Sequence, residues 1–168
     1  MTTAHVTPTL FVKMAISAWD SQVKQMDKLI DSFTDEQWMK EIAPGKNRGI
    51  YILGHLAAVN DYMLSLFEFG DRLHPEWESL FIRTPDKSGH EFPSLEELKK
   101  YWRQVNEALA NHFAKMEPAA WFLKHTSVSD EIFAREPHRN KLNVLINRTN
   151  HQSYHLGQLI LLQSKSSE

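Results

Sequence analysis

The sequence has no cysteine, no long apolar run and no excess of positive charge. The absence of cysteine from 168 residues excludes disulfides, thiolate metal ligands and a cysteine nucleophile. A membrane-spanning helix needs about 20 consecutive apolar residues, and no stretch approaches that length. The net charge is −2, with both signs interspersed and no run of lysine or arginine, which argues against binding to a phosphate backbone. We therefore expect neither a nucleic acid nor a membrane as a partner.

The length and composition are those of one globular domain. Hydrophobic residues make up 42% of the chain and charged residues 24%, as in folded soluble proteins. A chain of this size can bury a core without metal or disulfide support, so we expect residues 1–168 to form a single domain. Residues 1–10 lack the basic start and apolar centre of a secretory signal. The expected location is therefore cytoplasmic.

Four long segments carry apolar residues at steps of three and four, the period of a helix that buries one face. They span residues 10–33, 48–69, 95–116 and about 140–164. Thr34 with Gln37, and Ser94 with Glu97, have the spacing of a capping box, which marks a helix start. We predict an all-α protein, a four-helix bundle.

The connections between the later helices are unusually long. Gly70 to Pro93 separates the second helix from the third, and a similar stretch precedes the fourth, whereas bundle neighbours are usually joined by about 2–8 residues. Such a segment can reach about 70 Å, more than the roughly 30 Å of a 20-residue helix. We expect at least one to run the length of the bundle, which would make its neighbouring helices parallel. Strand signals at residues 121–125 and 127–133 are too short and irregular to pair.

Nine histidines make their placement the main functional question, because histidine is the commonest metal ligand. His151 and His155 are four residues apart on the last expected helix, so their side chains lie one turn apart and can share an ion. A pair at this spacing also arises by chance, and a solvated or interface pair is the alternative. Gln152 stands where a zinc protease carries its water-activating glutamate, which argues against that class.

The phase of the last helix separates these histidines from its apolar stripe. At about 100° per residue, the stripe consists of Leu142, Ile146, Leu156 and Ile160. Val144, Leu159 and Leu162 lie on the histidine side instead. We therefore expect this helix to be covered on two sides.

His55 near the start of the second helix reads, taken alone, as a core histidine with a hydrogen-bond partner. Ligating histidines need groups that orient them. Five polar residues lie within two turns of a candidate ligand: Asn60, Asp61, Tyr62, Asn147 and Gln158.

Three motifs together resemble the DinB/YfiT-like superfamily. They are Gly54-His55-Leu56 after the turn Pro44-Gly45-Lys46-Asn47, the spacing His151-x-x-x-His155, and Gly157-Gln158-Leu159. The resemblance covers nearly the whole chain in helix order and spacing. It implies a bundle of up-down-down-up order, a metal site formed by His55, His151 and His155, and a homodimer. It also implies a metal-dependent enzyme that uses a low-molecular-weight thiol.

The number and type of ligands limit the functions that such a site can have. Three imidazoles leave one position of a tetrahedral ion open, as in catalytic sites, and zinc or nickel suits imidazole best. We therefore expect a divalent-metal-binding protein, a thiol-using transferase or a hydrolase acting on a small molecule. Since the chain lacks cysteine, the thiol must be a co-substrate. The alternative is a non-catalytic, dimeric module that binds a metal or small ligand; a carboxylate di-iron bundle is excluded because paired Glu-x-x-His motifs are missing.

The other histidines and the tryptophans have structural interpretations. We expect the histidines to face solvent and most of the tryptophans to lie in the core. They are His74, His90, His112, His125 and His138, and Trp19, Trp38, Trp77, Trp102 and Trp121.

Overall fold

The computed structural model describes residues 6–163, and this part of the chain is mostly helical with no strand. The long helices are α1 (Val6–Ser32), α3 (Gly49–Leu66), α4 (Leu95–Phe113) and α6 (Lys141–Leu159). Shorter elements are α2 (Asp35–Met39), η1 (Pro75–Trp77), the π-helix η2 (Ser79–Arg83), η3 (Pro118–Phe122), α5 (Asp130–Arg135) and η4 (Ile160–Leu162). The prediction of an all-α protein is confirmed. No helix within residues 6–163 is long and apolar enough to cross a bilayer.

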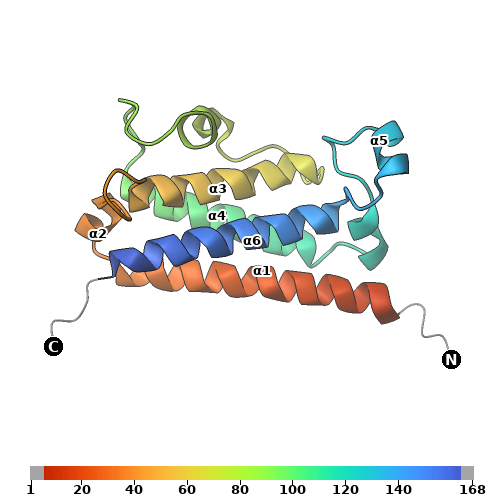
Figure 1. Cartoon of the computed structure of the whole chain (residues 1–168). Coiled ribbons are helices and arrows are strands. Elements are labelled where there is room, and N and C mark those ends of the chain that lie inside the picture. The colour runs from red at the N-terminus through yellow and green to blue at the C-terminus, as the bar shows by residue number, and fades with distance from the viewer. Residues whose placement is uncertain (1–5, 164–168) are drawn as a thin grey trace.

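The four long helices lie side by side (Figure 1). α3 packs mainly against α4, and α1 against α6, while α3 also contacts α6. In the view of Figure 1, α1 and α6 run from right to left, whereas α3 and α4 run from left to right. The chain between α3 and α4 returns along the outer side of α3 before α4 begins.

The helix starts follow the capping signals of the sequence. The Thr34 hydroxyl accepts a hydrogen bond from the Gln37 backbone, and the Gln37 side chain accepts one from the Thr34 backbone. Ser94 and Glu97 form the same reciprocal pair at the start of α4. Each box satisfies backbone N–H groups that lack a partner inside the helix.

The helix ends differ from the expected bounds. α3 ends at Leu66 rather than Phe69 because Glu68 adopts a positive φ of 63°, which breaks the helical path. α6 ends at Leu159 and continues as the single turn η4; the expected end near Ser164 lies outside the described residues. The segment 127–133, which carried a weak strand signal, contains the start of α5, capped by Ser129.

The core is rich in aromatic residues. Four of the five tryptophans are buried as expected, whereas Trp77 in η1 is half-buried. The expected stripe of α6 is partly wrong, because Ile146 and Ile160 are exposed. The helix instead buries Leu145, Gln152 and Leu159 against its neighbours. The core face is rotated from the stripe that the sequence indicated, and this rotation leaves the histidine side facing α3.

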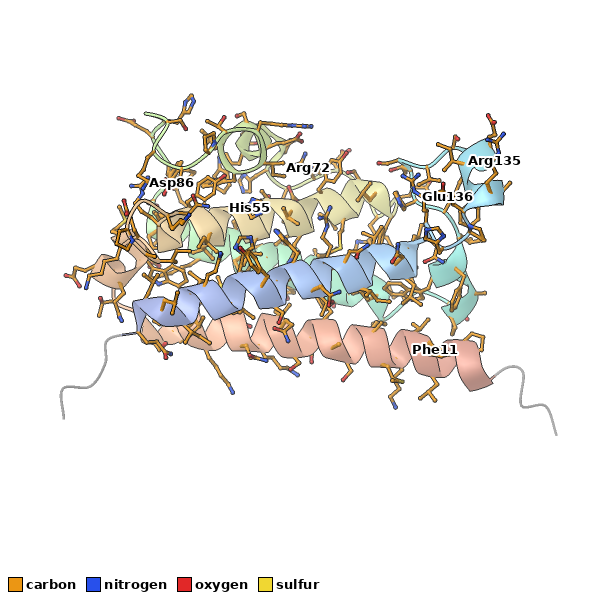
Figure 2. All side chains as sticks on the ribbon, viewed as in Figure 1. Phe11, His55, Arg72, Asp86, Arg135 and Glu136 are labelled. Atoms are coloured by element: carbon orange, nitrogen blue, oxygen red, sulfur yellow. The ribbon has the colours of Figure 1, made fainter. Side chains whose placement is uncertain are left out.

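The connection between α3 and α4, whose residues Arg72 and Asp86 are labelled in Figure 2, is fastened to α3 at two places. Near the start of α3, the buried carboxylate of Asp86 accepts hydrogen bonds from the Arg48 guanidinium and backbone, the shortest of 2.6 Å. Farther along, Asp61 accepts hydrogen bonds from the backbones of Leu73 and His74 at 2.8 and 3.2 Å. Such charge-assisted bonds are stronger than neutral ones. The intervening π-helix η2 is thereby held against the middle of α3.

Gly54 gives the Phe81 ring room to lie on α3. A Cβ atom at position 54 would stand 2.4 Å from Cε1 of Phe81, far inside van der Waals contact. Phe81 is fully buried and belongs to η2. The glycine therefore permits the close approach of η2 to the helix that carries His55.

We predict that Gly54→Ala destabilises the protein by about 1–3 kcal/mol, the usual effect of overpacking a filled core. For a domain of this size, each kcal/mol lowers Tm by about 2–4 °C. Thermal unfolding followed by circular dichroism measures the change.

Gly157→Ala is the matched control, since it is the same substitution within α6 but with no atom within 4 Å of the added Cβ. It should raise stability by up to about 1 kcal/mol, because alanine has the higher helix propensity. Equal effects of the two substitutions would contradict the packing role of Gly54.

Candidate metal centre

The structure brings His55, His151 and His155 together between α3 and α6. His55 Nε2 lies 3.2 Å from His151 Nε2, which lies 3.1 Å from His155 Nε2. One nitrogen from each ring lies within 4.8 Å of the others, so the three form a group that can hold a metal ion. His155 is 9% exposed and the other two are half-buried.

Hydrogen bonds on the outer sides fix the protonation of two of the rings. His55 Nδ1 lies 2.7 Å from the Phe81 carbonyl oxygen, and His155 Nδ1 lies 2.7 Å from Gln158 Oε1. Since each of these oxygens only accepts, each Nδ1 donates and carries the proton. In the neutral rings, the Nε2 lone pairs of His55 and His155 therefore face the centre of the cluster.

This arrangement fits a divalent ion. Two inward-facing lone pairs repel each other unless a proton or a cation lies between them, and His151 can supply only one Nε2 proton. Tetrahedral zinc with bonds of about 2.0–2.1 Å separates its nitrogen ligands by about 3.3 Å, close to the 3.1 and 3.2 Å found between the Nε2 atoms. His151 Nδ1 is buried without a hydrogen-bond partner among residues 6–163, so its tautomer is free to present Nε2 as a ligand.

The environment keeps the cluster neutral near pH 7. Burial lowers the pKa of His155 to about 4, against the opposing effect of the bond to Gln158. Burial also lowers the pKa of His151 to about 4, helped by the charges of His155, His55 and Arg148. Burial likewise lowers the pKa of His55. Neutral imidazole is the form that binds metals.

The residues proposed to orient the ligands divide into two groups. Gln158 bonds directly to His155. The structure gives the others different partners or none: Asn60 donates to Asn106, Asp61 holds the connection, and Asn147 is exposed. Tyr62 lies under the Arg72 guanidinium at 5.1 Å.

The remaining histidines among residues 6–163 lie outside the cluster. His90 and His138 are exposed as expected. His74, His112 and His125 are half-buried, and the first two stack on Trp77 and Phe69 with centroids 3.9 and 4.4 Å apart. The expectation that these three face solvent is wrong: His74 and His112 cover apolar neighbours, and His125 is partly buried as well.

Sequence reasoning missed two contributors to the site. The Phe81 carbonyl had no signal, since every residue has one. Arg148 had a signal: it precedes His151 by three residues, so it lies on the same face of α6. Its guanidinium is close enough to lower the pKa of both His55 and His151.

The fold and the site together define a class, helical bundles with a buried histidine cluster between two long helices. A family model described as the DinB superfamily matches residues 18–159, and the chain belongs to this superfamily. The match begins within α1 and ends at the last residue of α6, so it includes all three histidines. The comparison with curated proteins gives no match.

We predict that the metal-free protein loses stability as the pH falls from about 6.5 to about 4. The folded pKa values of His151 and His155 lie below the unfolded value of 6.5, so protonation favours unfolding. Their contribution is full above pH 6.5 and is lost on acidification, by at most about 3 kcal/mol for each histidine. Urea unfolding in the presence of a chelator, repeated across this range, measures the slope.

Carboxylates also titrate in acid and contribute to the same slope. The contribution of the cluster is therefore measured by comparing the pH dependence of stability in the wild type with that in a variant. His151→Asn should reduce the dependence between pH 6.5 and 4, since only the contribution of His155 remains, whereas His138→Asn, at an exposed position outside the cluster, should leave it unchanged. An unaltered slope in His151→Asn would show that the cluster is not the cause.

Proposed function

We propose that His55, His151 and His155 bind one divalent metal ion, zinc or nickel, and that the protein is a metal-dependent transferase or hydrolase using a low-molecular-weight thiol. The observation that carries the proposal is the inward direction of the imidazole lone pairs, held by Phe81 and Gln158 on the outer sides. Three imidazole ligands leave a position for a further ligand, as catalytic sites do. Membership of the DinB superfamily supports the same function.

The chain's own residues hold and position the reactants. When bound, the ion supplies a Lewis acid that lowers the pKa of a water or a thiol. Phe81 and Gln158 fix the planes of two rings, so little reorganisation is needed when the ion binds. η2 packs against α3, and the rest of the connection runs along the same outer side of that helix (Figure 1). We place the electrophile there, against the connection.

We also propose a single bundle domain of up-down-down-up order that forms a homodimer. The helix directions in Figure 1 and the pairing of α3 with α4 and α1 with α6 support this order. Exposed apolar side chains on α1, among them Phe11 and Met14 at 57% and 59%, support a contact surface.

We predict that His55→Ala, His151→Ala and His155→Ala each lower metal affinity by at least about tenfold, since each removes one of three ligands. Helicity should persist because the core lies mostly elsewhere. Protein without an affinity tag is stripped with chelator, titrated with zinc and nickel by calorimetry, and its retained metal is measured by mass spectrometry.

His90→Ala and His138→Ala are the controls, because both residues are exposed and outside the cluster. They should bind metal as the wild type does. Wild-type affinity in all three cluster variants would refute the metal site.

We predict metal-dependent transfer of an added thiol to a small electrophile. Metal-loaded protein is incubated with a panel of cellular thiols and a chromogenic electrophile, and turnover should be lost in His151→Ala. Equal rates for metal-free protein, or an unchanged cobalt spectrum on adding thiols, would favour the alternative function of a non-catalytic binding module.

A further inference from the structure

A small cavity lies next to the histidine cluster, on the side of the connection. It has a volume of about 240 Å³ and is lined by Val59, Tyr62, Glu78, Ile82, Arg83 and Arg148. Val59 follows His55 by one helical turn, Ile82 follows Phe81, and Arg148 precedes His151 by nearly one turn. The cavity and the cluster are therefore built from adjoining parts of α3, η2 and α6.

The charges of this region cancel except at one residue. Glu78 pairs with Arg72 and with Arg83, and Arg72 also lies 3.5 Å from Asp61. Two carboxylates thus face two guanidinium groups. The positive charge of Arg148 has no carboxylate partner among residues 6–163.

Arg148 has no hydrogen bond or ion pair to any residue from 6 to 163, although it is half-buried and its Nε is out of contact with solvent. A guanidinium has five N–H donors. A buried donor without a hydrogen-bond acceptor disfavours the folded state. Burial also lowers the pKa of Arg148, which means that the charge is poorly solvated. A ligand that accepts from the guanidinium would relieve both effects.

We infer that Arg148 binds the carboxylate of a small anionic ligand whose other end reaches the histidine cluster. A carboxylate matches the flat fork of a guanidinium with two parallel hydrogen bonds. One uncompensated positive charge suits a monoanion better than a phosphate, which carries nearly two negative charges at neutral pH. Three residues of helix separate the Cα atoms of Arg148 and His151 by about 4.5 Å along the axis, so one small molecule can contact both side chains.

This inference rests on the proposed metal site and names the class of molecule that the site accepts. The probes are 3-mercaptopropionate and 3-mercaptopropionamide, which have the same thiol and nearly the same size but differ in charge. Their binding to cobalt-loaded protein is followed by calorimetry and by the sulfur-to-cobalt absorption band.

The wild type should bind the acid at least about tenfold more tightly than the amide. Arg148→Gln should remove this preference for the acid over the amide, each measured on protein saturated with cobalt, and Arg148→Lys should restore part of it. Arg103→Gln is the matched control, since Arg103 is an exposed arginine of α4 paired with Asp31. It should keep the full preference.

The outcomes separate the two proposals. If cobalt binds but acid and amide bind equally in the wild type and Arg148→Gln, the assignment of Arg148 is wrong while the metal site stands. If inorganic phosphate displaces the acid better than acetate does, the carboxylate class is wrong. If no cobalt binds, the proposed metal site fails and this inference fails with it; circular dichroism confirms that each variant is folded.

Discussion

The contact between the Phe81 ring and the bare α-carbon of Gly54 determines how the rest of the site is arranged. It brings η2 onto α3, where the Phe81 carbonyl accepts a hydrogen bond from Nδ1–H of the adjacent His55. The backbone hydrogen bonds of a π-helix join residues five apart rather than four, and such turns are frequent at functional sites. The ion pair of Arg48 with Asp86 and the bonds to Asp61 keep the connection in place on either side. The direction of one imidazole thus depends on a glycine, a main-chain carbonyl and two carboxylates.

Electrostatics and burial act in the same direction at this site. The cluster is buried enough to keep its rings neutral, and the cation of Arg148 on the same helix strengthens this effect on His151. Neutral imidazoles bind a metal, whereas protonated ones repel it. The two ends of the proposed ligand pocket therefore differ in kind: one end offers lone pairs, and the other offers unpaired donors and a positive charge.

Much of the helical content and the pair His151 and His155 could be predicted from local patterns in the sequence, whereas His55 joined them only through the family resemblance. Helical periodicity and capping boxes are local, so the starts at Asp35 and Leu95 followed from Thr34 and Ser94. The His-x-x-x-His spacing is also local. The buried face of α6 could not be predicted, because Gln152 is buried and Ile146 exposed against their ordinary preferences. The Phe81 carbonyl depends on how a long connection folds back, and no side-chain pattern encodes that contact.

The two sides of the cluster come from distant parts of the sequence, since His55 and His151 are 96 residues apart. No fragment that lacks α6 contains more than one of the three nitrogens. During synthesis the site is therefore absent until α6 has emerged and has docked between α1 and α3. An ion held there would act as a cross-link between α3 and α6, and its capture would distinguish molecules with a docked α6 from those without one.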